Sequence, residues 1–132
     1  MFYSSIPIGL GLLGLILLFL SLRVVRLRNN LMIELGDGGN DELRRAIRAH
    51  ANFVEYVPIC LLLILVGQGM AVSGWIILVA MIALVVGRAL HAIGLSGNAG
   101  PSPGRLVGTL LTWVVLGGMS IVLLVYALLR LW

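Results

Sequence analysis

Residues 48–58 read Arg48-Ala-His-Ala-Asn52-Phe-Val-Glu55-Tyr56-Val-Pro58, so an arginine, an asparagine and a glutamate stand at the start of a strongly apolar run. A charged side chain at the centre of a bilayer costs about 2.5–3.5 kcal/mol on insertion scales, which makes such residues rare and functional by default. Glu55, an ionisable residue within an apolar run, is therefore a candidate functional residue.

The composition around this stretch is that of an integral membrane protein. The chain has 132 residues, of which 61% are hydrophobic and only 11% are charged. In lipid only helices and closed barrels satisfy the backbone, and a helix of about 20 apolar residues crosses the hydrocarbon core. We expect an all-α fold in which residues 1–132 form a single transmembrane four-helix bundle. Its first apolar segment precedes its arginines, which favours a retained membrane helix over a cleaved signal peptide.

The apolar runs predict four membrane helices, at residues 6–29, 41–66, 75–95 and 104–131. Glycine-rich residues 31–40 predict a flexible connection, and Asp41 is expected to cap the second helix. Both longer connections lie on one side of the bundle, together with Arg23, Arg26, Arg28, Arg44, Arg45, Arg48, Arg88 and Arg105. The positive-inside rule then places both connections in the cytoplasm and both chain termini on the non-cytoplasmic side.

One face of the second predicted helix is polar. At about 100° per residue, steps of three and four return to the same side of a helix. The resulting stripe contains Asp41, Arg44, Arg45, Arg48, Asn52 and Glu55. Arg88 and His91 form a shorter stripe on the third helix, and Arg26 and Arg105 add positive charge from neighbouring elements. We therefore expect four elements to converge on one basic pocket at membrane depth.

The side chains of this pocket suit a small zwitterion with more than one carboxylate. Arginines bind carboxylates bidentately, Glu55 accepts from an ammonium group, and Asn52 both donates and accepts along a peptide-like backbone. Glutathione has those groups, although from the chemistry alone a lipid head group or another anion fits nearly as well. With two histidines and one cysteine in the chain, we expect no metal site. Nothing in the sequence indicates nucleic-acid binding.

The pattern Arg48-Ala-x-x-Asn52-x-x-Glu55-Tyr56-x-Pro58 resembles the second-helix signature of the MAPEG family, the membrane-associated proteins in eicosanoid and glutathione metabolism. Val25-Arg26-Leu27-Arg28 looks like the end of that family's first helix, and Gly87-Arg88-x-x-His91 is similar to its third-helix element. Arg105, which follows a proline-containing link, is placed like the family's catalytic arginine. The resemblance covers the whole chain, whose short form is similar to the bacterial members.

This resemblance implies a homotrimer in the bacterial inner membrane, with glutathione held between adjacent subunits in a cavity that opens toward the cytoplasm. The residues that it assigns to glutathione binding are Arg26, Arg48, Asn52, Glu55, Tyr56, Arg88 and His91. Arg105 would stabilise the thiolate, because a nearby guanidinium lowers the pKa of a thiol and the thiolate is the nucleophile. Leu95 and Leu106 depart from the tyrosine and serine of some eukaryotic members, so no particular eicosanoid reaction is assigned.

The function that we expect is that of a glutathione transferase or peroxidase acting on lipophilic small molecules that arrive through the membrane lipid. Two other functions stay open: a family member that works as a binding or scaffolding protein, and a small multidrug transporter, which also has four short helices and a lone membrane glutamate. Some residues also have structural alternatives. Arg44 and Arg45 fit a role at anionic head groups, and Arg48 and Glu55 fit a buried pair that holds helices in register.

Overall fold

The computed structural model describes residues 5–97 and 102–130, without the side chains of residues 95–97. This part of the chain is helical and contains no strand. Its helices are α1 (Ser5–Leu31), α2 (Asp41–Gly69), α3 (Gly74–Gly97) and α4 (Pro103–Leu129). All four are long and apolar enough to cross a bilayer, which confirms the predicted all-α membrane architecture. The bounds agree with the predicted ones to within three residues, and the predicted last residue of the fourth helix, Leu131, lies outside the described residues.

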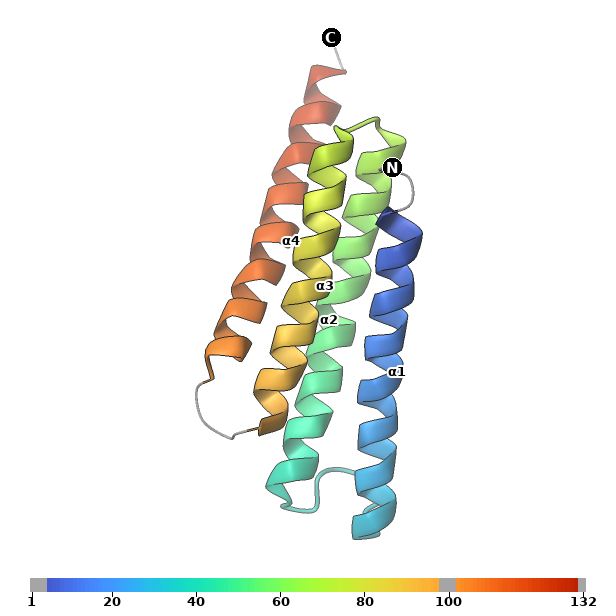
Figure 1. The fold of residues 1–132 in the computed structure, drawn as a ribbon, viewed down its shortest axis with the longest axis vertical. Helices are drawn as coiled ribbons and strands as arrows, with labels where there is room; N and C mark the ends of the chain where they lie inside the picture. The colour runs from blue at the N-terminus through green and yellow to red at the C-terminus, as the bar shows by residue number, and fades with distance from the viewer. Residues whose placement is uncertain (1–4, 98–101, 131–132) are drawn as a thin grey trace.

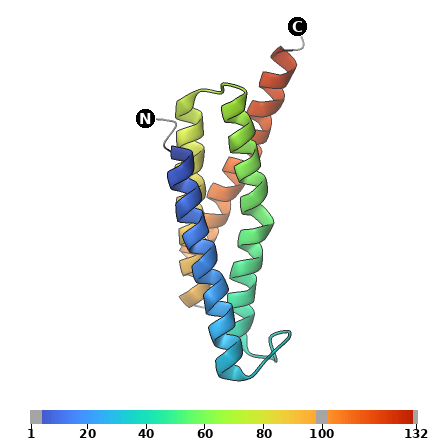
Figure 2. The ribbon, with the colours of Figure 1, turned by 90° about the vertical axis from the view of Figure 1, so that its right-hand side faces the viewer.

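α2 and α3 form the centre of the bundle. α1 packs against both of them and so does α4, but α1 and α4 do not contact each other in the described ranges. Figures 1 and 2 show helices that run alternately up and down, with α4 inclined away from α1. The α1–α2 loop, the end of α3 and the start of α4 lie at one end of the bundle, which we call the loop end. The α2–α3 turn lies at the opposite end.

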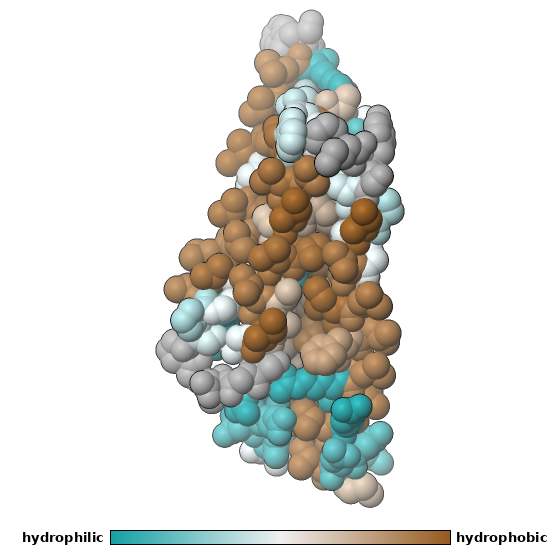
Figure 3. Space-filling view, viewed as in Figure 1, coloured by the Kyte–Doolittle hydropathy of each residue, from teal (hydrophilic) through white to brown (hydrophobic). Residues whose placement is uncertain are grey.

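Much of the apolar surface faces outward. Figure 3 shows a broad hydrophobic belt, with hydrophilic side chains gathered toward the loop end. On α1, Leu15 is 64% exposed and Phe19 is 61% exposed, and Val79 on α3 is 61% exposed. Water does not tolerate so large a continuous apolar surface. Lipid or another membrane protein must therefore cover these faces.

The α1–α2 loop is held by side chains at both of its ends. Arg28 Nη1 donates to three backbone carbonyls at 3.3, 3.1 and 3.0 Å, which belong to Ile33, Glu34 and Gly36. At the far end Asp37 Oδ1 accepts from Gly39 N at 2.9 Å. The flexibility that the glycines predicted is not tested by these contacts, which show how Arg28 and Asp37 bond to the loop backbone.

Asn40 caps α2, so the prediction that Asp41 is the cap was wrong by one residue. Asn40 Oδ1 accepts from Leu43 N at 2.9 Å, and Asp41 is already the first helical residue. Asparagine and aspartate are equally good caps. The sequence therefore could not say which of the two neighbours has the extended backbone that a cap requires.

Glycines bring α3 and α4 into backbone contact. A Cβ atom added at Gly108 would lie 2.5 Å from the carbonyl oxygen of Gly87 and 2.7 Å from His91 N. One added at Gly94 would lie 2.5 Å from Arg105 N. Small residues permit this kind of approach between membrane helices. The contact places the start of α4, with Arg105, directly beside the end of α3.

Hydrogen bonds tie α4 at both ends. At the loop end Ser102 Oγ accepts from Arg105 N at 3.2 Å, as the cap of α4, and donates to the carbonyl oxygen of Gly94 at 3.1 Å. At the opposite end Arg130 Nη2 donates to the carbonyl oxygen of Met70 at 2.6 Å. The position of α4 is thus fixed relative to α3 and to the α2–α3 turn.

We expect Gly108→Ala to destabilise the protein, because its methyl group would overlap backbone atoms that cannot move away individually. Overpacking typically costs about 1–3 kcal/mol, which thermal unfolding in detergent would detect as a lower melting temperature. Gly117→Ala is the matched control in the same helix, since a Cβ atom there meets nothing within 4 Å. Equal melting temperatures for the two variants would contradict the close contact.

Candidate functional site

A pocket of about 190 Å³ opens at the loop end, where Figure 3 shows the hydrophilic surface. Three helices line it, with Arg44, Arg45, Arg48 and Asn52 from α2, His91 from α3 and Arg105 from α4. Four of these were predicted as site residues from the sequence: Arg48, Asn52, His91 and Arg105. The polar stripe of α2 and the glycine contact between α3 and α4 together bring them to one place.

Arg44 and Arg45 also line the pocket, whereas the sequence left them a role at lipid head groups. The spacing of Arg44 and Arg45 from Arg48 could have identified them as pocket residues. They precede Arg48 by four and three residues, and residues so spaced are neighbours on a helix surface. The same stripe that pointed to Arg48 therefore included them.

Arg26 does not reach this pocket within one chain. It is exposed on α1, and α1 has no contact with α4 in the described ranges. Three elements converge on the pocket, not the expected four, because α1 packs on the other side of the α2–α3 pair. Leu95 and Leu106 are the two positions where the sequence differs from the tyrosine and serine of some eukaryotic family members. Leu106 is 62% exposed, and the side chain of Leu95 lies outside the described residues.

The charge of Arg44 is already compensated. Its Nε donates to Asp37 Oδ2 at 2.7 Å, and its Nη1 lies 3.3 Å from Asp41 Oδ1. The pKa of Asp37, in the loop outside the membrane spans, is lowered by the hydrogen bond from Gly39 N and then by the one from Arg44. The carboxylate therefore stays ionised at neutral pH, and its contact with Arg44 is lost only as the pH falls through that lowered pKa.

Arg45, Arg48 and Arg105 contribute uncompensated positive charge. Within the described part of the chain, none of these three side chains forms an ion pair or a hydrogen bond. Arg45 Nε is in addition buried without a partner. Like charges around so small a pocket repel one another. An anionic group placed among them would relieve that repulsion, so the chemistry of the pocket is that of an anion site.

Arg88 lies behind the pocket and does not line it. This arginine is only 2% exposed. Its Nη1 donates to Asn52 Oδ1 at 2.8 Å and approaches the backbone oxygen of the same residue at 3.4 Å. Its Nε is buried without a partner. The resemblance implied that Arg88 binds the ligand, but within one chain it contacts Asn52, which does line the pocket.

Glu55 and Tyr56 also lie outside the lining of the pocket. Glu55 is exposed on α2, and Tyr56 is half-buried. A hydrocarbon core of about 20 residues that ends at Gly69 would begin near Ala49 on the side of the loop end, and Glu55 would then lie about 9 Å inside that edge. None of the ion pairs among the described residues joins Glu55 to Arg48. The buried pair that the sequence allowed is therefore not formed within one chain.

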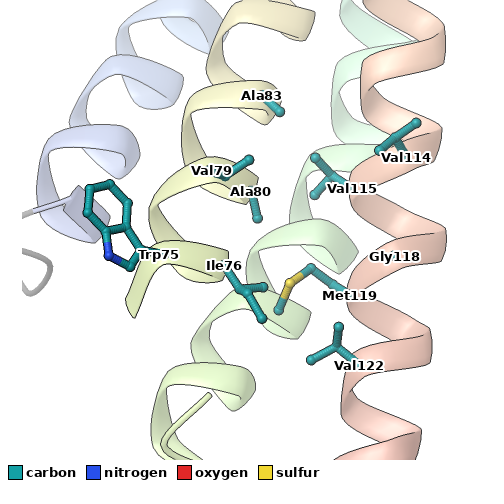
Figure 4. A pocket seen from close by; sticks show the side chains of 10 residues that line it. All are labelled: Trp75, Ile76, Val79, Ala80, Ala83, Val114, Val115, Gly118, Met119 and Val122. Carbon is teal, nitrogen blue, oxygen red and sulfur yellow. The ribbon is translucent and has the colours of Figure 1, made fainter. Parts of the chain in front are cut away.

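Two apolar grooves lie between helices, apart from this pocket. Figure 4 shows the first, with a volume of about 410 Å³, between residues 75–83 of α3 and residues 114–122 of α4. The second, of about 560 Å³, lies between α1 and α3, and its walls include Leu12, Phe19, Val85 and Ile93. No charged side chain lines either groove. The lining of both suits apolar molecules.

Comparison with known proteins gives a family match over nearly the whole chain. The model of the MAPEG family matches residues 6–125. Two relatives, from Escherichia coli K12 and from an O6:H1 strain of the same species, are both named inner membrane protein YecN. Each is 41% identical over 81 residues, which is 61% of this chain and 62% of YecN. The match thus spans less than two thirds of the length of these relatives. No solved structure matches the chain.

Proposed function

Because the chain belongs to the MAPEG family of membrane proteins, we propose that it binds glutathione and acts as a glutathione-dependent transferase or peroxidase on lipophilic electrophiles. The observation that carries this proposal is the pocket at the loop end, where uncompensated guanidinium groups of α2 and α4 surround Asn52 and His91. Arginines bind carboxylates bidentately, and glutathione has two carboxylates. The family match also favours this function over that of a small multidrug transporter.

The size of the pocket supports an assembly of several chains. It measures about 190 Å³, whereas ligand pockets usually measure about 300–1,000 Å³. One chain would therefore hold only part of a tripeptide. Of the four predicted site residues outside its lining, Arg88 is buried behind the pocket. The other three, Arg26, Glu55 and Tyr56, are exposed or half-buried on α1 and α2, where a second chain can complete the site. The assembly that we propose is a homotrimer with glutathione between adjacent chains.

The orientation follows from the distribution of arginine. The loop end carries the pocket and all the arginines except Arg130, so the positive-inside rule places it in the cytoplasm. Both chain termini would then lie on the non-cytoplasmic side. The name of the relative, inner membrane protein YecN, supports a bacterial inner membrane as the location. The pocket would thus open toward the cytoplasm, where glutathione is abundant.

Arg105 is the residue to which we assign activation of the thiol. It lies in the first turn of α4, behind the cap Ser102, so its guanidinium and the positive end of the helix dipole act on the same region. Both would lower the pKa of a thiol held there, and the thiolate is the nucleophile. Glutathione supplies the thiol. The electrophile would arrive through the lipid that surrounds the apolar faces of the bundle.

The first test is isothermal titration of glutathione into the protein in detergent. We expect heat of binding from the unaltered protein, and affinity about 10- to 100-fold lower for Arg48→Ala, because a hydrogen bond to a charged group contributes about 1.5–3 kcal/mol. Arg130→Ala, at the opposite end of the bundle, is the control and should bind normally. A protein that gives no heat with glutathione would instead favour the binding or scaffolding function.

The second test asks whether neighbouring chains share a site. Native mass spectrometry should show a trimer, and Arg26→Ala and Arg48→Ala should each weaken glutathione binding. In trimers assembled from an equal mixture of the two variants, a site built from Arg48 of one chain and Arg26 of the next should be intact in about one quarter of cases. If both side chains came from the same chain, mixing would restore no sites. A stable monomer that binds glutathione would contradict the assembly.

The third test separates binding from activation. Arg105→Leu should leave glutathione bound, because other arginines hold its carboxylates, but should reduce the thiolate fraction at neutral pH. One unit of thiol pKa corresponds to about 1.4 kcal/mol, and the ultraviolet absorbance of the thiolate, titrated with pH, measures it directly. Arg45→Leu removes the same charge from the same pocket and is the control. Identical titration curves for Arg105→Leu and the unaltered protein would exclude Arg105 from the activation.

A further inference from the structure

Asn52 is the one amide in the lining of the basic pocket, and it is also the contact of the buried Arg88. We propose that Arg88 fixes the carboxamide of Asn52 so that only its NH₂ group is available to the pocket, which makes the pocket selective for an anionic group without a hydrogen-bond donor, such as a carboxylate. The inference rests on the proposed function only for the choice of glutathione as the ligand.

The chemistry of the contact determines how the amide is turned. A guanidinium group has donors and no acceptor. The Asn52 atom that lies 2.8 Å from Arg88 Nη1 must therefore be the carbonyl oxygen, as the structure has it. If the amide were turned over, its NH₂ group would face another donor. Two facing donors form no hydrogen bond, so the amide has one stable orientation.

Burial makes this orientation costly to change. Arg88 is 2% exposed, and its only hydrogen-bond acceptors among the described residues are the side-chain and backbone oxygens of Asn52. Turning the amide would leave a buried cation with a single long contact to a backbone oxygen. An unsatisfied buried charged group is among the most unfavourable arrangements in a protein. Arg88 is thus a positioning residue, which acts on the pocket through Asn52.

The lining of the pocket then consists almost entirely of donors. The Asn52 NH₂ group joins the guanidinium groups of Arg45, Arg48 and Arg105, and one ring nitrogen of His91 is the only side-chain acceptor in the lining. The sequence predicted that Asn52 both donates and accepts; in the structure its oxygen accepts from the buried Arg88, which turns that oxygen toward Arg88. A carboxylate satisfies such a pocket, whereas an ammonium group meets like-charged guanidinium groups and only the ring nitrogen of His91 as an acceptor.

This division of roles also gives an orientation for a zwitterionic ligand. The exposed carboxylate of Glu55 lies on the same helix as Asn52 but outside the lining of the pocket. The ammonium group of glutathione would therefore lie toward Glu55, and one carboxylate would enter the pocket beside Asn52. The donor-only amide is what prevents the reverse arrangement.

Asn52→Asp tests the role of the amide, because it keeps an oxygen for Arg88 and replaces the NH₂ donor by an acceptor. We expect the variant to melt no lower than the unaltered protein and to bind both glutathione and inorganic sulfate at least about tenfold more weakly. Arg44→Gln is the matched control, since it changes the charge of the pocket by the same amount at an arginine already paired with Asp37 and Asp41. It should weaken binding only about two- to threefold.

The outcomes separate the two proposals. Sulfate binding that Asn52→Asp abolishes, in a protein that ignores glutathione, would support the donor-only pocket and contradict the proposed function. Binding of either probe by Asn52→Asp that equals or exceeds that of Arg44→Gln would overturn the inference. It would also be overturned if the unaltered protein bound neither probe, since a pocket of uncompensated donors must bind anions.

Nuclear magnetic resonance of the Asn52 side-chain amide tests the role of Arg88. Asparagine is labelled with ¹⁵N, and the Asn52 signal is the one that disappears in Asn52→Asp. Sulfate should shift the NH₂ protons downfield in the unaltered protein and in Arg88→Lys, which keeps a donor facing the oxygen. The shift should be lost in Arg88→Met. A full shift in Arg88→Met would overturn the positioning role of Arg88. If Arg88→Met does not fold, Arg88→Lys decides instead, and loss of the shift in that variant would overturn the role.

Discussion

The backbone contact between α3 and α4 is the constraint on which the polar end of this protein depends. With glycine at positions 87, 94 and 108, the two helices approach until backbone meets backbone. Arg105 is carried on that contact and faces a pocket whose other arginines belong to α2. A larger side chain at any of these glycines would move the start of α4 outward. The charge density that defines the site is therefore a product of close packing as much as of arginine content.

Within this arrangement the arginines have distinct roles that their identical chemistry does not reveal. Arg44 is held by two carboxylates and adds little free charge. Arg28 binds three carbonyls and gives the α1–α2 loop its shape. Arg88 is buried and is stabilised by amide oxygens without a carboxylate. Only a subset, Arg45, Arg48 and Arg105, presents uncompensated charge to the pocket.

The helices and the core of the site could be predicted from the sequence, because membrane thickness sets the length of an apolar run and helical periodicity puts Arg48 and Asn52 on one face. Which helices are neighbours could not be predicted. Every face of α1 is apolar over most of its length, so no pattern showed that it packs away from α4 and keeps Arg26 from the pocket. The burial of Arg88 was equally hidden, since an arginine near a helix end usually extends to the head groups. Its position follows from tertiary packing against Asn52.

Glu55 shows what membrane embedding means for a single chain of this protein. Its carboxylate is exposed on α2 at a depth where hydrocarbon surrounds a monomer, and no described residue of the same chain neutralises it. A newly inserted chain must therefore draw water and head groups inward around Glu55 or find a protein surface that covers it. An unshielded Glu55 carboxylate therefore destabilises a monomer in the bilayer. A partner that shields the carboxylate removes this destabilisation. If Glu55 binds ligand between chains as we propose, the same carboxylate would also favour assembly of the chains before any ligand arrives.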